Sequence, residues 1–450
     1  MRHIQLMSIV AFAGALALAL APVAHAGSFE DALAAAYTNN PRIKVERQRL
    51  EATDEGVAQA VSGFRPTVTA NYNNGGQRTS FNGADSVRGN SEIKQLRVEQ
   101  PLFRGGGTWS SYQSALQRVK AGQYDLSALE QRVLLDSVTA YMNVVELSAI
   151  LDLSRQNEVV LGEQLKAAST RFQVGEVTRT DVAQAQARLS GAKSSVITAE
   201  GNLLSAIATY ERTIGVRPEG SLAVPDSLPQ LPESLDLALE RARSANPQLL
   251  SALHAAKAST YDVDTNQAVL LPRVNFVGSL SRQTGTGAAG TSDFDQDRFG
   301  VEVAIPIYQA GAEWSRVREA QAAARQRSHE SIDRRLSVDE SVTQSWEQLE
   351  SAIANITTRN DQIQAANLAL EGVKQEQQFG ARTVLDVLDA EQELFTARTN
   401  LVRAQRDRIV AAYNVAFTLG QLTPSQLGLK VAAYDPQAHA DDVRWQPLGF

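Results

Sequence analysis

Residues 175–181 read Gly175-Glu176-Val177-Thr178-Arg179-Thr180-Asp181, and residues 380–386 read Gly380-Ala381-Arg382-Thr383-Val384-Leu385-Asp386. Both copies have the pattern Gly-x-x-Thr-x-x-Asp. Glycine can adopt the left-handed backbone conformation that ends a helix. A threonine followed three residues later by an acid is typical of the first turn of the next helix. The pattern therefore predicts a tight turn between two helices at each place.

The two turns belong to a tandem duplication. Asn40-Pro41 recurs 206 residues later as Asn246-Pro247, and Pro101-Leu102-Phe103 recurs 205 residues later as Pro306-Ile307-Tyr308. A period this long exceeds that of solenoid repeats, so each half is a complete structural unit. We expect a first repeat over 27–215, a linker over 216–234, a second repeat over 235–420 and a C-terminal tail over 421–450.

Each repeat starts with two helices and continues with a pair of strands. The Asn-Pro dipeptide ends one helix and precedes another, which predicts helices over 29–39, 41–62, 235–245 and 248–269. Apolar residues that alternate with polar ones, such as Val68, Ala70 and Tyr72, predict strands. The strand pairs are expected over about 64–103 and 271–308, with Asn- and Gly-rich loops at about 74–90 and 284–296.

Two long tracts contain no proline. The proline after Pro101 is Pro218, and the proline after Pro306 is Pro424. Residues 107–172 and 312–377 are rich in helix-forming side chains and predict helices of roughly 100 Å each. A helix of that length needs a partner along its side, so we expect each to fold back at its glycine turn as a helical hairpin, over about 107–215 and 312–420.

Composition and the N-terminus exclude several classes of protein. Residues 1–26, with an apolar run over 6–21 and the sequence Ala24-His25-Ala26, are typical of a secretory signal peptide. The 450 residues carry a net charge of −7 and no cysteine. The charge argues against a nucleic-acid partner, and the lack of cysteine excludes disulfide scaffolds and thiolate sites. We find no credible catalytic set, and we predict neither enzymatic activity nor a cofactor or metal.

The strand count bears on membrane insertion. No stretch after residue 26 predicts a transmembrane helix, so insertion would require a closed β-barrel. Four strands per chain are too few, because about eight are the practical minimum. Two chains would supply eight strands and three would supply twelve, and the residues do not choose between them. A soluble sheet remains the alternative.

One acidic pair stands out beyond the turn pattern. Asp386 and Asp389 are three residues apart and share a helix face. Because two carboxylates on one face repel, they indicate either a solvated surface or a function. Acidic rings around an opening select cations.

The duplication, the strand pairs and the segment from Arg382 to Ala390 resemble the TolC family of outer-membrane efflux proteins. The resemblance covers residues 28–430. It implies a mainly α fold with a small β part: a homotrimeric α-helical barrel below a shared 12-stranded transmembrane β-barrel, with four strands from each chain. It also implies the exit duct of a tripartite efflux pump or a type I secretion system, in the Gram-negative outer membrane with a large periplasmic part. The implied partners are outer-membrane lipid, a periplasmic adaptor protein, and an inner-membrane transporter of the RND, ABC or MFS type.

The resemblance also implies roles for particular residues. Asp386 and Asp389 match the acidic rings of the pore entrance. Arg382 matches an arginine that holds the entrance closed through links to residues that match Thr180 and Asp181. The adaptor is expected to dock on the hairpin tips, at Gly175, Glu176, Gly380 and Ala381.

One departure from the family concerns the gate. Gln377 stands where the family has a tyrosine that joins the closing links, which predicts a weaker closed state. Opening is expected as an iris-like movement of the second hairpin, 312–420, against the first.

A secreted or periplasmic coiled-coil scaffold without a pore is the alternative function. It accounts for the long helical arms. It does not account for the two amphipathic strand pairs.

Overall fold

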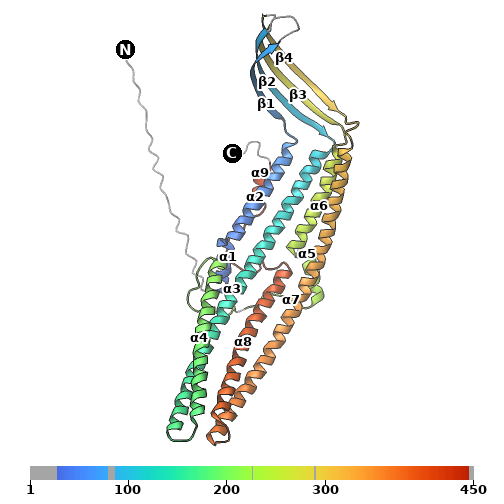
Figure 1. Cartoon of the computed structure of the whole chain (residues 1–450). Helices are drawn as coiled ribbons and strands as arrows, with labels where there is room; N and C mark the ends of the chain where they lie inside the picture. Colours follow the sequence, from blue (N-terminus) through green and yellow to red (C-terminus); the bar gives the residue numbers. More distant parts are fainter. Residues whose placement is uncertain (1–27, 80–86, 226, 288–289, 445–450) are drawn as a thin grey trace, which may run out of the picture.

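The computed structural model of the chain describes residues 28–79, 87–225, 227–287 and 290–444. The predicted signal peptide lies outside these ranges. The molecule is long, with a β-sheet at one end and two helical tips at the other (Figure 1).

The two repeats contain the same elements in the same order. The first consists of α1 (Phe29–Asn39), α2 (Pro41–Ser62), β1 (Thr67–Thr79), β2 (Val87–Arg104), α3 (Gly107–Gln173) and α4 (Arg179–Ile214). The second consists of α5 (Leu235–Ala245), α6 (Pro247–Ala268), β3 (Arg273–Gly287), β4 (Gly290–Ala304), α7 (Ala312–Gln378) and α8 (Val384–Thr418). A short helix, α9 (Ala438–Val443), follows. The structure thus has the duplicated order of elements that the offset of about 205 residues predicted.

The four strands form one antiparallel sheet in the order β1-β2-β3-β4. The central β2–β3 pair joins the two repeats, and β1 and β4 lie at the edges. Residues directly opposite each other on neighbouring strands lie on the same face. The register places apolar side chains of all four strands on one face: Val68, Leu96, Phe276 and Val301 are members of this set.

The predicted loops at 74–90 and 284–296 are wrong for the described residues. Asn74 pairs with Glu92 and Gly76 with Asn90 in the β1–β2 ladder, and Thr286 pairs with Thr291 in the β3–β4 ladder. Asparagine and glycine are poor strand formers, but here the neighbouring strand supplies backbone hydrogen bonds that outweigh this preference. At the lower end, residues 305 and 307 lie beyond the end of β4, although their alternation had placed them in a strand.

The long helices have the predicted extent, but each needs more than one partner. α3 and α7 contain 67 residues each, whereas their return helices α4 and α8 contain only 36 and 35. The return helix therefore covers the half of the long helix that lies nearer the tip. In the half nearer the sheet, α3 packs against α2 and α6, and α7 packs against α6 (Figure 1).

One window of α3 is apolar enough to resemble a membrane span. An 18-residue window has a mean hydropathy of 1.3, although no transmembrane helix was predicted after residue 26. More than half of this window, 56%, is buried inside the molecule. Its buried side chains, among them Leu134 and Tyr141, pack with α1 and the ends of α4 and α8 in the largest apolar cluster. This part of α3 therefore belongs to the core of the molecule.

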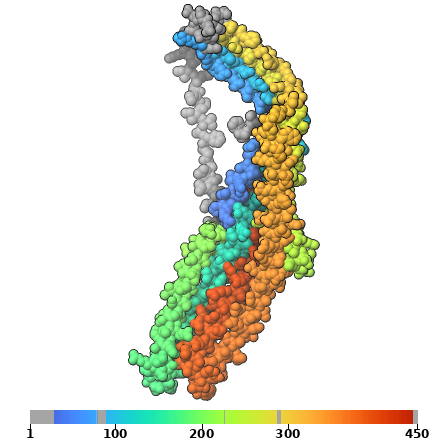
Figure 2. All heavy atoms as spheres, turned by 45° about the vertical axis from the view of Figure 1, so that its right-hand side comes forward, coloured from blue at the N-terminus to red at the C-terminus, as the bar shows by residue number. Residues whose placement is uncertain are grey.

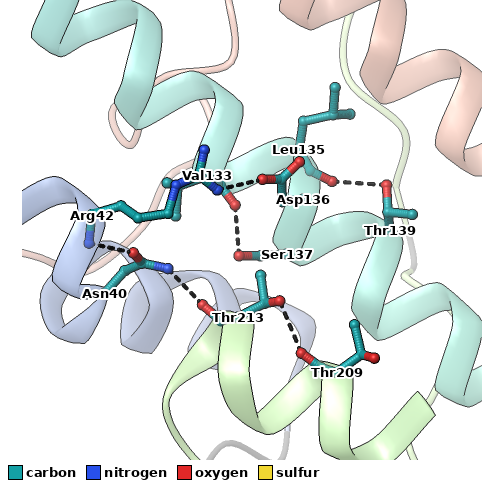
Figure 3. Close-up of polar contacts among 9 residues, drawn as sticks. All are labelled: Asn40, Arg42, Val133, Leu135, Asp136, Ser137, Thr139, Thr209 and Thr213. Carbon is teal, nitrogen blue, oxygen red and sulfur yellow. Dashed lines mark hydrogen bonds and ion pairs between the residues drawn. The ribbon is translucent and has the colours of Figure 1, made fainter. Parts of the chain in front are cut away.

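The two Asn-Pro dipeptides connect each helical pair to its return helix. Asn40 begins α2 and also donates from Nδ2 to the carbonyl oxygen of Thr213 at 2.8 Å, near the end of α4 (Figure 3). Asn246 begins α6 and donates in the same way to the carbonyl oxygen of Thr418 at 2.9 Å, at the end of α8. The dipeptide therefore marks a junction where the start of one helix is bonded to the end of another.

The C-terminal tail packs along the first repeat. Leu422 and Leu429 belong to the largest apolar cluster, and α9 lies against α2. His439 Nδ1 lies 3.3 Å from Oδ2 of Asp54, whose side chain is 1% exposed. Burial raises the pKa of the Asp54 carboxyl, and the neighbouring His439 partly offsets this.

Candidate functional site

Each hairpin tip is a tight helix turn with the geometry that the repeated pattern predicted. Gly175 and Gly380 have φ angles of 82° and 76°, in the left-handed region. The amide of Glu176 donates to the carbonyl of Arg171, and the amide of Ala381 donates to the carbonyl of Glu376, both at 2.9 Å. These bonds, which close the last turn of α3 and α7, are those of a Schellman motif.

The threonine and the aspartate of each pattern form a capping box. The backbone N–H and the hydroxyl of Thr178 each donate to Asp181 Oδ2 at 2.8 Å, and the backbone N–H of Asp181 donates to the Thr178 hydroxyl. Thr383 and Asp386 repeat these contacts, with both bonds to Asp386 Oδ2 at 2.8 Å. The bonds from the Thr383 backbone and hydroxyl lower the pKa of Asp386, and Arg382 adds to the effect. Asp386 is therefore an ionised carboxylate held in one place at the start of α8.

Asp389, the second acid of the pair, contacts the other hairpin. Its Oδ1 lies 2.6 Å from Nη2 of Arg188, which is on α4. Arg188 was not among the predicted site residues, because it lies 201 positions away from Asp389 in the chain. The sequence did hold one sign that Arg188 belongs to the tip: it lies seven residues after Asp181, which places both side chains on the same face of α4.

Arg382 forms an ion pair within its own hairpin. Its Nε lies 2.8 Å from Glu376 Oε2, in the last turn region of α7. Among the described residues of this chain, no hydrogen bond or ion pair joins Arg382 to Thr180 or Asp181. The predicted closing link is therefore not made within one chain, and it stays a prediction about contacts between chains.

Next to the turns, the start of α8 packs against the first hairpin and against α7 of its own hairpin. Val384 and Leu388 join a buried apolar cluster with residues of the first hairpin, among them Ala185 and Leu189. Val387 and Leu394 pack instead on α7. The two tips consequently lie side by side at the end of the molecule opposite the sheet (Figure 2).

An ion pair with one buried partner joins α8 to α7. Lys374 Nζ lies 2.6 Å from Glu391 Oε1, and Glu391 is 8% exposed. This pair lies one helical turn beyond Val387. Within the described ranges, no group of three acidic or histidine side chains is arranged as a metal site.

The tips expose the residues predicted to receive an adaptor. Gly175, Glu176, Gly380 and Ala381 are all exposed. Phe379, next to Gly380, is an apolar side chain with 87% of its surface exposed. Gln377, at the position expected to hold a tyrosine, is only half-buried.

Comparison with known proteins gives one consistent result. The family model described as outer membrane efflux protein matches the chain twice, over residues 32–216 and 238–421. These two matches coincide with the two repeats. The outer membrane efflux protein BepC of Brucella suis is 34% identical over 419 residues, which span 93% of this chain and 91% of BepC. The alkaline protease secretion protein AprF of Pseudomonas aeruginosa is 25% identical over 442 residues, which span 94% of this chain and 90% of AprF.

A solved structure shows the same fold. The CmeC outer membrane channel of Campylobacter jejuni superimposes with a TM-score of 0.77 over 92% of this chain and 88% of CmeC. The sequence identity is 16%, so this likeness concerns the fold alone.

Proposed function

Because the chain belongs to the outer membrane efflux protein family, we propose that three copies of it form one duct that crosses the outer membrane and extends into the periplasm. The chain is an outer-membrane channel protein and the exit component of an efflux pump or a type I secretion system. Such a duct conducts its substrates passively from the periplasm to the exterior. The inner-membrane transporter of the complex supplies the energy and largely chooses the cargo.

The sheet is the observation that supports assembly from several chains. β1 and β4 each have one strand neighbour within the chain. In lipid, every unpaired backbone group at such an edge costs several kcal/mol. Pairing β4 of one copy with β1 of the next removes both edges. Three copies supply twelve strands, the number that the family resemblance implies.

The apolar face of the sheet and the residues below it fit a lipid surface. Phe299 and Val301 are 67% and 61% exposed on the apolar face. Trp109 and Trp314 stand in the first turns of α3 and α7, just below the sheet, and are 57% and 60% exposed. Exposed tryptophans are enriched where a membrane meets water. This exposure supports a role at the periplasmic lipid boundary.

The entrance of the duct is proposed at the hairpin tips. In a trimer, Asp386 and Asp389 would each contribute one ring of three carboxylates. Arg382 would close the entrance by pairing with Thr180 and Asp181 of a neighbouring copy. The exposed tip residues Glu176 and Ala381 would receive the adaptor protein.

The pair Arg382–Glu376 bears directly on this gate. Because Glu376 holds the Arg382 guanidinium within its own hairpin, it competes with any link from Arg382 to another chain. The two side chains should therefore have opposite effects. Loss of Arg382 removes the closing link, whereas loss of Glu376 frees Arg382 to make it.

Single-channel recording in planar bilayers tests the proposal. Purified wild-type protein should migrate as a heat-sensitive trimer and form channels. Arg382→Ser should increase the conductance of the closed state, and Glu376→Gln should lower it or leave the channel shut for longer. A protein that stays monomeric and forms no channels would favour the coiled-coil scaffold. Channels with equal conductance in both variants would remove Arg382 from the gate.

A further inference from the structure

One ion pair joins the two hairpins of the chain beside the proposed entrance. Arg188 on α4 and Asp389 on α8 are 2.6 Å apart, with side chains 40% and 55% exposed. Directly next to it, Val384 and Leu388 of α8 pack on Ala185 and Leu189 of α4. Separation of α8 from α4 must break both the ion pair and this apolar contact.

The ion pair is not a by-product of the duplication. At the offset of 205 residues, the counterpart of Arg188 is Glu393 and the counterpart of Asp389 is Gln184. Glu393 accepts a hydrogen bond from Gln362 within its own hairpin. The two residues at the equivalent positions of the other repeat therefore cannot form this ion pair, and the opposite charges occur at one of the two repeat-related pairs of positions.

The second hairpin is built to move as a unit. The half-buried Lys374–Glu391 ion pair and the packing of Val387 on α7 bind the start of α8 to its own long helix. Near the tip, by contrast, α8 meets the first hairpin through the exposed Arg188–Asp389 ion pair and one apolar cluster. A movement of one hairpin against the other would therefore separate Arg188 from Asp389 before it separated α7 from α8.

We propose that Arg188 is a gate residue whose ion pair with Asp389 holds the two hairpins of one chain together while the entrance is closed, and whose release exposes the Asp389 carboxylate to cations. The two acids of the entrance then differ in role. Asp386 accepts its hydrogen bonds from Thr383 in its own helix turn, so its position does not depend on the other hairpin. Asp389 becomes a free carboxylate only when the hairpins part. This inference rests on the proposed channel function.

The expected size of the effect follows from the exposure of the pair. An exposed ion pair changes an equilibrium constant by roughly 1.4- to 5-fold. If three chains open together, loss of all three pairs changes the ratio of open to closed channels by about 3- to 150-fold. Both ends of this range are measurable in single-channel records.

Arg188→Gln is the test variant, and Arg155→Gln is its matched control. Arg155 and Glu200 form an ion pair of 2.8 Å with side chains 55% and 46% exposed, but both belong to the first hairpin. In planar bilayers, Arg188→Gln should raise the open fraction and Arg155→Gln should leave it unchanged. Arg188→Gln should also bind a blocking trivalent cation more tightly, because Asp389 is no longer neutralised.

Two further variants separate the charge pair from general loosening of the tip. Asp389→Asn should open the channel to the same extent as Arg188→Gln but weaken cation block. The exchange Arg188→Asp with Asp389→Arg should restore the closed state. The chain has no cysteine, so Arg188→Cys with Asp389→Cys allows a reducible crosslinker to be placed across the hairpins, and the crosslinked channel should open only after reduction.

The outcomes separate this inference from the proposed function. Channels whose open fraction is the same in wild type, Arg188→Gln and the crosslinked protein would overturn the role of Arg188 and leave the channel function intact. If Arg155→Gln opened the channel as much as Arg188→Gln, the effect would be one of stability, which would also overturn it. A complete absence of channels in every variant would overturn the proposed function and this inference together.

Discussion

The two Asn-Pro junctions allow a quantitative prediction, because the duplication provides the same experiment twice. In Asn246→Ala, the helix α6 loses the side-chain oxygen that accepts from the amides of Gln248 and Leu249, at 2.9 and 3.2 Å. Loss of such a cap costs about 1 kcal/mol. The buried bond from Asn246 Nδ2 to the carbonyl of Thr418 is also lost. A buried carbonyl without its donor costs a further ~1–3 kcal/mol.

Hydrogen exchange measured by mass spectrometry on the detergent-solubilised protein detects this loss. The sum of about 2–4 kcal/mol corresponds to at least roughly 30-fold faster exchange of the Gln248 and Leu249 amides, if these amides open through local unfolding. Asn246→Asp is the matched control, because aspartate caps a helix as well as asparagine does but has no amide to donate. In this control the cap is kept and only the loss at the Thr418 carbonyl remains, ~1–3 kcal/mol, so exchange of the two amides should accelerate less than in Asn246→Ala.

The first repeat supplies the replicate. Asn40 accepts from the amide of Arg42 at 2.9 Å and donates to the carbonyl of Thr213 at 2.8 Å. Asn40→Ala should therefore accelerate exchange at Arg42 by a similar factor. Unchanged exchange in either alanine variant, or a strong effect in one repeat and none in the other, would refute the claim that both dipeptides serve the same junction.

Three other predictions concern stability. Gly420→Ala places a Cβ 2.5 Å from a backbone carbonyl oxygen of the α5–α6 junction and should prevent recovery of folded trimer. Gly380 has a similar φ but lies in open space, so Gly380→Ala should cost only about 1–2 kcal/mol in urea unfolding. Equal losses in the two variants would contradict the steric argument. Lys374→Met leaves the buried Glu391 carboxylate without its partner, and because Lys374 itself is 41% exposed the loss should be about 1–3 kcal/mol. Lys374→Met with Glu391→Leu should recover most of this, and a neutral single variant would contradict it. Because burial raises the pKa of Asp54 in the folded state, ionisation of Asp54 opposes folding above its ordinary pKa. Protection of α9 from proteolysis should therefore increase as the pH falls from neutral towards the acid range, and should increase less in Asp54→Asn. An identical pH profile in the two proteins would contradict this prediction.

The features predictable from sequence are those encoded locally. Gly175 and Thr178 determine the backbone at their own positions, so the turn and the capping box follow from a seven-residue pattern. The same holds for the helix starts at Pro41 and Pro247, where the fixed φ of proline suits the first turn.

The features that escaped prediction depend on partners far away in the chain. Asn74 belongs to a strand because Glu92 lies opposite it, and its own strand propensity argues against this. The ion pair of Arg188 with Asp389 requires two hairpins to be placed side by side. The packing of the C-terminal tail on α2 likewise depends on a surface that is formed from other segments.

We propose that the hairpin tips form the periplasmic entrance of an outer-membrane pore. The most direct test of this proposal is sided cation block of single channels, with a trivalent cation added to one face of the bilayer at a time. We expect block from the side of the helical tips only, and loss of that block when Asp386 and Asp389 are both replaced by alanine. Block of equal strength from both sides, or block that survives the double replacement, would contradict it.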